Sequence, residues 1–556
     1  MNSRSAPNNS SMIGLGNLQA VVNASDQVTK TNKGFHGFAG LTAFDTATVN
    51  GGASCFNCTG SPPDQGLCVS DNYVMEAINL AMTVYSPTGA RMAPIIPLYG
   101  FFKLSAIQFV FDVECFRDTG TGRWFINAAQ IVVNPNGSFS GLAFDQIAVS
   151  QTRNPLGNYY LYQIPTVDNG SMGTPSNPGC PCFGDRPVIG TDANGYYVTT
   201  QEAGVFNHST NNGAQVYAIS KADLVSGDAP TVVHIDAGQV MVPYGGLTPT
   251  LQPAMNSPGQ PYAKNAEFFL SSLCFNCGSF PVFGDNRLAI WALTSTDTLT
   301  WSTPKVSLAF SVIASEGYGF PYSVNQSRGE RPLSEYLSKH VNPNNNLLEQ
   351  LAGGDARMQM VTYADGLLWA AVTTPVLQSG YGIKDGIAYF VISPVLSENG
   401  GVDGKVVKQG YISFRGGDVM YPSVGVNSKG FGVVSFSLVA TFTITTPGPT
   451  PPATNNTSMK KTEGIFPSAA YALINISGVG PIHIAAEGVG PVDDWTGYPA
   501  LGNSSGAGFG TSRWGDYSWA VAAPNGHIWI ASEYIPSGPR AFYANFGTFI
   551  SQLRTN

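Results

Sequence analysis

The sequence predicts an all-β protein in which about seven four-stranded blades form a single β-propeller. Three observations favour this fold: a hairpin unit recurs along the chain, turn residues are abundant, and helical periodicity is almost absent. Gly (64) and Pro (38) make up nearly a fifth of the 556 residues, and both residues mark turns. Radial repetition of a unit allows one closed all-β domain to reach this length.

The recurring unit begins with a polar loop that carries Asp, followed by a short apolar strand, an Asn/Asp-Gly type of turn and a β-branched, aromatic strand. This pattern predicts a β-hairpin. Further β-rich segments, such as 215–220 and 388–393, would complete four-stranded blades. Seven copies are found, at 62–86, 115–131, 184–202, 267–273 with 285–295, 354–374, 417–437 and 514–534.

The predicted domain organisation is a polar N-terminal extension over 1–34 and a propeller over 35–556. Insertions are expected at about 325–353, with a helix over 332–341, and at 443–462, a Pro/Thr/Asn-rich loop. The segment 35–44 should complete the last blade and so remove an exposed sheet edge. An array of β-sandwiches is the competing architecture, whereas a TIM barrel would need a helix after each strand.

The composition narrows the class of protein. A net charge of −8 and a pI of about 5.3 argue against nucleic acid and anionic membrane surfaces as partners. Apolar runs stay shorter than the roughly 18 residues of a membrane span. Only 11% of residues are charged, against about 25% in a typical soluble domain. Such a neutral polar surface indicates a secreted, extracellular protein.

Eight cysteines fall into two groups of four along the chain. A CxxC pair can hold zinc, whereas an exported protein uses cysteines in disulfides. Disulfides are favoured because the two CxxC pairs lie more than 200 residues apart, and the pairing stays open. The cysteines are Cys55, Cys58, Cys68 and Cys115, then Cys180, Cys182, Cys274 and Cys277. We expect them to join long loops near the mouth of the propeller.

Four motifs give the chain a family resemblance. They are PPD at 62–64, GDRPVIGTDANGY at 184–196, GDARMQMVTY at 354–363 and RWGDYS at 513–518. The chain resembles secreted, mostly bacterial β-propeller proteins that are compared with sialidases of the BNR type. It departs from their pattern at Gly354, where an acidic residue is usual. The resemblance implies a propeller and export, and it implies no catalytic assignment.

The hairpin unit predicts where chemistry could take place. The start of its first strand and the end of its second lie at one edge, so Asp185 and Glu202 should meet there, as should Asp516 and Glu533. If the first strands are innermost, these side chains surround one mouth of the propeller. The predicted catalytic residues are Asp185, Glu202, Asp355, Asp516 and Tyr517. The predicted substrate-binding residues are Arg186, Arg357, Arg513 and Trp514.

This ring of acids and arginines suits several chemistries. Paired carboxylates can hydrolyse glycosides, arginines bind carboxylated sugars, and clustered Asp oxygens suit Ca²⁺ as a possible cofactor. The plainer interpretation is that each Asp holds backbone amides or a neighbouring Arg. The leading hypothesis is a hydrolase or lyase for extracellular polysaccharide or glycan. The alternative is a non-catalytic glycan- or protein-binding, adhesion or self-assembling surface protein, of open oligomeric state.

Overall fold

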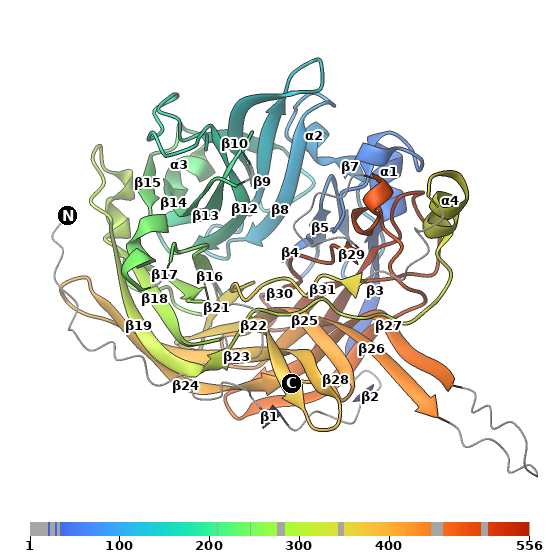
Figure 1. The fold of residues 1–556 in the computed structure, drawn as a ribbon. Helices are drawn as coiled ribbons and strands as arrows, with labels where there is room; N and C mark the ends of the chain where they lie inside the picture. The colour runs from blue at the N-terminus through green and yellow to red at the C-terminus, as the bar shows by residue number, and fades with distance from the viewer. Residues whose placement is uncertain are drawn as a thin grey trace, which may run out of the picture.

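The computed structural model describes residues 21–22, 28–29, 34–207, 209–244, 246–274, 284–342, 350–445, 460–501 and 510–554. Its strands form seven four-stranded antiparallel blades, which confirms the predicted β-propeller (Figure 1). Blade 1 contains β4 (Gly66–Val69), β5 (Val74–Ile78), β6 (Ala81–Tyr85) and β7 (Ile96–Pro97). Blade 2 contains β8 (Phe109–Arg117), β9 (Trp124–Val133), β10 (Phe139–Ser150) and β11 (Tyr159–Pro165). Blade 3 contains β12 (Cys182–Thr191), β13 (Gly195–Gly204), β14 (Asn211–Ser220) and β15 (Val232–Asp236).

The remaining blades continue in chain order. Blade 4 contains β16 (Gln252–Asn256), β17 (Ala266–Ser272), β18 (Asp285–Thr294) and β19 (Ser307–Tyr318). Blade 5 contains β21 (Val361–Ala364), β22 (Leu367–Gln378), β23 (Gly382–Leu396) and β24 (Val402–Ile412). Blade 6 contains β25 (Gly417–Val426), β26 (Gly432–Thr445), β27 (Lys460–Asn475) and β28 (Gly478–Gly488). Blade 7 contains β30 (Trp519–Ala522), β31 (Ile528–Tyr534), β32 (Gly547–Leu553) and β3 (Phe35–Thr42).

The first strand of each blade is the innermost one. Each of these strands contacts the first strand of the next blade, in an unbroken circle from β4 through β8, β12, β16, β21, β25 and β30 back to β4. Blades 4 and 5 are joined further, because β16 and β21 pair in parallel. All seven first strands therefore begin at the same end of a central channel.

The hydrophobic core lies between the blades. Separate clusters of buried side chains join blades 1 and 2, 3 and 4, 4 and 5, and 5 and 6. The largest cluster joins the remaining neighbours and includes Trp519, Trp529 and Tyr471. Both faces of a blade are thus buried, which explains why the strands are rich in β-branched and aromatic residues on both faces.

The N-terminal strand closes the ring, as the sequence predicts. β3 pairs antiparallel with β32, with Phe38 opposite Ile550. The buried Glu76 of blade 1 binds this closure, because its carboxylate accepts hydrogen bonds from Leu41 N (2.9 Å) and from the Thr548 hydroxyl. The last blade therefore combines both ends of the chain, and it is hydrogen-bonded to the first blade.

Asx turns close several hairpins at the end of the molecule opposite the strand starts. Asp192 Oδ1 accepts hydrogen bonds from Asn194 N (2.8 Å) and Gly195 N (2.6 Å), and Asn427 Oδ1 accepts one from Lys429 N (3.0 Å). A side chain that holds its own turn in this way fixes the register of the strands on either side. The Asn/Asp-Gly motif in the repeat is therefore a structural signal.

Two of the predicted hairpin units are displaced from their blades. In blade 2 the first strand begins at Phe109, so Asp118 follows its far end and bonds Lys221 (3.1 Å) and Tyr262 (2.8 Å). In blade 4 the predicted hairpin corresponds to the second and third strands, and Asp285 begins the third strand. Both units were misplaced because Asp and apolar alternation recur in outer strands as well as in the first strand.

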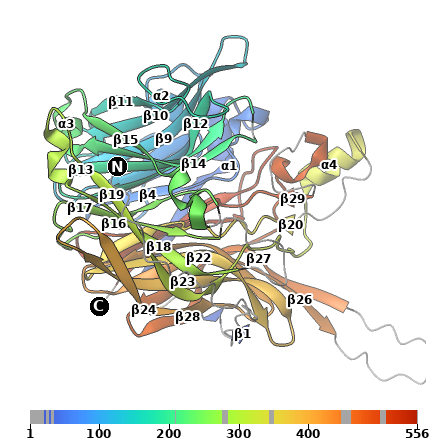
Figure 2. The same ribbon diagram turned by 60° about the vertical axis from the view of Figure 1, so that its left-hand side comes forward.

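The segments between blades hold most of the helices. α1 (Ala43–Asn50), α2 (Leu98–Phe101), α3 (Lys221–Ser226) and α4 (Pro332–His340) are the α-helices of the described residues, with 3-10 turns at Phe56–Cys58, Gly238–Tyr244, Thr296–Thr300, Trp495–Gly497 and Pro499–Leu501. α4 confirms the helix predicted at 332–341. In Figure 2 it lies on the same side as β20 (Gln350–Leu351) and β29 (Thr511–Ser512), which pair in parallel.

The predicted insertion at 443–462 is partly sheet. The β26–β27 ladder continues as far as Thr445 opposite Lys460, and this hairpin projects from the ring in Figure 1; 446–459 lie outside the described residues. β1 (Val21–Val22) and β2 (Val28–Thr29) pair with β22 and β28, while most of 1–34 is outside the described residues. The domain limits themselves stay a prediction.

Disulfides are present, as the sequence predicts. Cys68 bonds Cys115 and so joins the first strands of blades 1 and 2, whereas Cys55–Cys58 and Cys180–Cys182 close short local loops. Cys274 is also disulfide-bonded, and Cys277 lies outside the described residues. The expectation that the bonds join long loops is wrong for the two local pairs, because their partners are three and two residues apart. No helix in the described ranges is long and apolar enough to cross a membrane.

Candidate functional site

The entry of the central channel is marked by an unusual backbone conformation. Six blades have a residue with positive φ at or just before their first strand, and in β8, β12 and β25 it lies at a break in the ladder register. These residues are Asp64 (φ 44°), Asp112 (50°), Arg186 (49°), Gly354 (81°), Tyr421 (55°) and Gly515 (29°). Such bulges bend the strand and redirect the neighbouring side chains. The repeat therefore builds a ring of reoriented residues at one end of the channel.

Charged side chains from five blades meet at this ring. We call them the mouth cluster: Asp64, Asp112, Asp185, Arg186, Asp355, Arg357, Arg513, Asp516 and Tyr517. Their electrostatic interactions run across the channel, since Asp185 of blade 3 is influenced by Arg357 of blade 5 and Arg513 of blade 7. The structure thus brings together seven of the nine residues predicted to be catalytic or substrate-binding.

Two ion pairs occupy the outer part of the cluster. Arg357 Nε lies 2.5 Å from Asp355 Oδ2, and Arg357 Nη1 donates to Gln201 Oε1 (2.9 Å). Arg513 forms the second pair, with Asp516. Asp355 also accepts a hydrogen bond from Arg357 N (2.8 Å). These acids do what the plainer interpretation expected, because each one holds a neighbouring arginine.

Asp185 differs from these paired acids. In the part of the chain that the structure describes, its half-buried carboxylate has no hydrogen-bond partner. Burial raises its pKa, while Arg357 and Arg513 oppose the rise. The neighbouring Asp112 has a pKa raised to about 7, mainly by burial and further by Asp185 and Asp516. Both carboxyl groups therefore favour the protonated form more than a free aspartic acid does, and Asp112 does so up to about neutral pH.

Arg186 and Tyr517 lie beneath the ion pairs. Arg186 is buried, its Nη2 donates to Gln359 Oε1 (3.2 Å), and its guanidinium carbon lies 5.5 Å from the centre of the Tyr517 ring. Arg186 Nε and Nη1 and the Tyr517 hydroxyl have no hydrogen-bond partner within the described residues. Buried donors without partners are costly. Such donors near the strand entries mark a place where an oxygen-rich ligand could bind.

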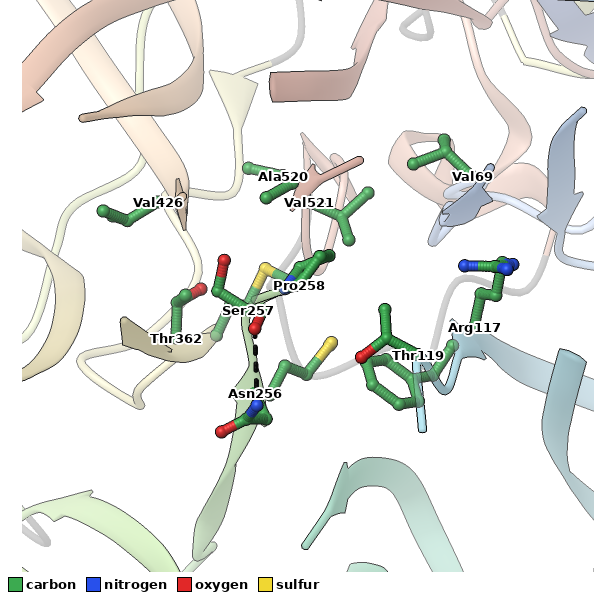
Figure 3. A pocket seen from close by; sticks show the side chains of 14 residues that line it. Val69, Arg117, Thr119, Asn256, Ser257, Pro258, Thr362, Val426, Ala520 and Val521 are labelled. Carbon is green, nitrogen blue, oxygen red and sulfur yellow. Dashed lines mark hydrogen bonds between the residues drawn. The ribbon is translucent and has the colours of Figure 1, made fainter. Parts of the chain in front are cut away.

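The opposite end of the channel is lined by apolar and polar side chains, including the charged Arg117. Figure 3 labels Val69, Val426 and Val521 there, together with Asn256, whose Nδ2 donates to Ser257 O (3.3 Å). The cavity between these side chains holds about 20 Å³, which is room for about one water molecule. This cavity is therefore too small for a sugar ring.

Two predicted site residues lie away from the cluster. Glu202 points to the other face of blade 3, where its carboxylate accepts hydrogen bonds from Asn177 Nδ2 (3.0 and 3.2 Å). Trp514 is buried in the core, with its indole N–H donating to Ser437 Oγ (2.9 Å). The prediction that Glu202 meets Asp185 is wrong, because in the hairpin Glu202 lies opposite Gly184, the residue before Asp185. Since side chains alternate along a strand, this register directs Glu202 away from Asp185.

Three residues of the site were not predicted from the sequence: Asp112, Gln201 and Gln359. Asp112 lies three residues before Cys115, much as Asp64 lies four residues before Cys68. That similarity could have identified Asp112 as the strand entry of blade 2. Gln201 and Gln359 carry no comparable signal, because a glutamine in a strand has no distinctive spacing.

Calcium binding stays a prediction. Among the described residues, three possible metal ligands come within 4.8 Å of one another at Cys180, Cys182 and Glu202. The two sulfurs are joined in a disulfide, so they are not thiolate ligands. In the mouth cluster, Asp355 and Asp516 are already bound to arginines.

The fold and the site together define the class of protein: a seven-bladed β-propeller with a mixed acid and arginine cluster at one channel mouth. No family model matches the chain, and no curated protein matches it. An exo-β-1,3-galactanase from Clostridium thermocellum is similar at 9% identity, with a TM-score of 0.28, over 91% of this chain and 96% of that one.

Two further solved structures are similar at the same level. An endo-1,5-α-L-arabinanase from Thermotoga petrophila has 10% identity and a TM-score of 0.24, over 75% of this chain and 96% of that one. Drosophila Plexin A, solved with Semaphorin 1b, has 9% identity and a TM-score of 0.22, over 95% and 87%. At these values the similarities add nothing to what the strand topology shows.

Proposed function

We propose that this protein is a secreted glycoside hydrolase that acts on extracellular polysaccharide at the mouth cluster. The observation that carries the proposal is that two acids with raised pKa values, Asp112 and Asp185, belong to one cluster with two carboxylates held by arginines. Glycoside hydrolysis needs one protonated and one ionised carboxyl group on either side of the scissile bond. The disulfides support the proposed export, because they persist in oxidising compartments.

The roles follow from the contacts. Asp185 is the general acid, because its carboxyl group is half-buried and free of hydrogen bonds and burial raises its pKa. Asp516, which is paired with the nearby Arg513, is the base or nucleophile. Arg186 and Tyr517 bind sugar oxygens with their unpartnered donors. With Asp516 as the base, the glycosidic C–O bond breaks, the leaving oxygen takes the proton of Asp185, water supplies the new hydroxyl, and the remaining proton of that water passes to Asp516. With Asp516 as the nucleophile, a C–O bond to Asp516 forms as the glycosidic bond breaks, and water then hydrolyses it and returns a proton to Asp185.

The alternative is glycan binding without catalysis, as predicted for an adhesion or surface protein. One observation favours it: Arg357 and Arg513 are each neutralised by an aspartate close by in the sequence, as expected for ion pairs with a purely structural role. The same donors, Arg186 and Tyr517, would then bind a sugar that is never cleaved.

The test is a screen of soluble polysaccharides for new reducing ends, with unsaturated products measured in parallel to detect a lyase. Asp185→Asn and Asp516→Asn should each lower turnover about 10²–10⁴-fold, the usual contribution of acid–base catalysis. Their melting temperatures should match that of the wild type. Full turnover in both variants would overturn the proposal, and binding without any turnover would favour the alternative.

A further inference from the structure

Beside the mouth cluster lies a group of aromatic side chains with no assigned role. We call it the aromatic shelf: Phe109, Phe111, Phe183 and Phe206. Phe109 and Phe206 are 41% and 61% exposed, and the other two are half-buried. Exposed aromatic residues that gather at one place mark interaction sites, whereas isolated ones do not.

The shelf is assembled by blades 2 and 3. Phe109 and Phe111 stack with ring centres 4.5 Å apart, and Phe111 meets Phe183 edge-on at 6.0 Å. Within the described residues Phe206 makes no ring contact with these three; it lies over Gly141 of blade 2, where an added Cβ would come within 3.2 Å of its ring. Gly141 has φ +84°, a conformation that favours glycine. The absence of a side chain at this position leaves room for the ring.

The shelf continues directly into the mouth. Phe111 precedes Asp112 in β8, and Phe183 lies two residues before Asp185 in β12. Phe206 follows the end of β13, at the same edge of blade 3. A molecule that reaches Asp185 from this side must therefore pass over the phenylalanine rings.

Apart from the mouth cluster itself, two segments that adjoin the shelf are polar but carry no formal charge. The adjoining segments 131–144 and 203–215 contain no Asp, Glu, Lys or Arg. Their exposed groups are amides and hydroxyls, such as Asn136, which accepts a hydrogen bond from the Ser138 hydroxyl (2.8 Å). Aromatic faces bordered by neutral hydrogen-bonding groups match the two faces of a neutral sugar, one apolar and one rich in hydroxyls.

From this continuity and this chemistry we infer that the aromatic shelf binds a neutral polysaccharide chain and leads it to the mouth cluster. The inference rests on the proposed function and specifies its substrate class. Each ring supports one part of the chain, so the shelf acts on polymers and leaves short substrates unaffected. Acidic polymers gain nothing from it, because the shelf offers them no cation.

The experiment compares the wild type with the double variant Phe111→Ala/Phe183→Ala and with Phe206→Ala. Phe431→Ala is the matched control, because Phe431 is 45% exposed at the β25–β26 turn, at the opposite end of the molecule. Xylan, galactan and mixed β-glucan serve as neutral probes, and polygalacturonate serves as the acidic probe. Binding is measured by affinity electrophoresis and turnover by reducing ends. Melting temperatures verify folding. If the double variant does not fold, Phe206→Ala alone tests the inference.

The expected result is binding to at least one neutral polymer that falls about tenfold in the shelf variants, as expected for the loss of one or two aromatic contacts. Turnover of a short aryl glycoside and every property of Phe431→Ala should stay unchanged. Unchanged polymer binding in the shelf variants, or binding only to polygalacturonate, overturns the inference while Asp185→Asn still tests the proposed function. Self-association that disappears in Phe206→Ala overturns it in favour of a contact between copies. If the protein neither binds nor cleaves any probe, both the inference and the proposed function are wrong.

Discussion

Replacing Glu76 by Gln should stabilise the propeller above neutral pH and leave its stability unchanged in acid. Glu76 is fully buried where blade 1 meets the closing strands β3 and β32, and burial raises its pKa from 4.5 to about 7. Its carboxylate accepts hydrogen bonds from Leu41 N (2.9 Å), Tyr85 OH (3.2 Å) and the Thr548 hydroxyl. A glutamine can reproduce these contacts, because its amide N–H can donate to Thr548 Oγ1, which in turn donates to Leu41 O (3.0 Å).

The sign and size of the effect follow from the two pKa values. Between pH 4.5 and 7 the folded state binds more protons than the unfolded state, so the contribution of Glu76 to stability falls as the pH rises. Above pH 7 the loss is complete and amounts to about 3 kcal/mol, at 1.36 kcal/mol for each tenfold difference in acidity. Glutamine does not titrate. The variant should therefore equal the wild type at pH 4 and exceed it by up to about 3 kcal/mol at pH 8.

Urea unfolding at both pH values measures this difference, and other titrating groups cancel because they are common to both proteins. Glu335→Gln on the exposed surface of α4 is the matched control and should change nothing at either pH. Parallel stability curves for Glu76→Gln and the wild type would show that Glu76 does not titrate in this range. A loss of stability at every pH would show that glutamine cannot take over the hydrogen bonds.

Three further outcomes can be checked on the same material. Replacing both cysteines of the Cys68–Cys115 bond by serine should lower the free energy of unfolding by about 4 kcal/mol, and the same change at Cys55–Cys58 should lower it by less than about 2 kcal/mol. The difference arises because the first bond joins residues 47 apart and the second joins residues 3 apart. Equal losses in urea unfolding would contradict this loop-length argument. Deleting β3 should expose the edge of β32 and cause association detectable by light scattering, and a monodisperse, equally stable product would mean that the last blade closes without it. If Asp112 and Asp185 share the catalytic proton, activity should fall as the pH rises through about 7, and Asp112→Asn should remove this alkaline limb; a limb that persists in the variant would assign it to another group.

The repeat in the sequence was sufficient to predict the architecture because turns and alternation are local properties. Seven blades, the closing role of 35–44 and the helix at 332–341 all followed from segments of about 10 to 25 residues. The sequence alone did not show reliably which strand of a blade is innermost. Asp118 and Asp285 resemble strand entries in the sequence, and only the contacts between first strands show which strand is innermost.

The sequence predicted where the candidate site lies, but it predicted less well which side chains point into it. Position along a strand placed Asp185, Arg186 and Asp516 at the mouth, but which face a residue occupies depends on a single step in register. One step separates Gln201, which reaches Arg357, from Glu202, which does not. The positive φ of Asp112 adds a bulge that no simple count along the sequence anticipates.

The closure of the ring by β3 also determines when the protein can finish folding. β3 is among the first strands to leave the ribosome, and its partner β32 is the last strand of the chain. Their pairing, with Phe38 opposite Ile550, is among the most distant contacts in sequence that the chain can make, and distant contacts form slowly. Until β32 has been made, β3 has an unpaired edge and blade 7 is incomplete. The edge of β3 is therefore open to pairing with other chains for as long as the roughly 500 residues between the two strands are being synthesised.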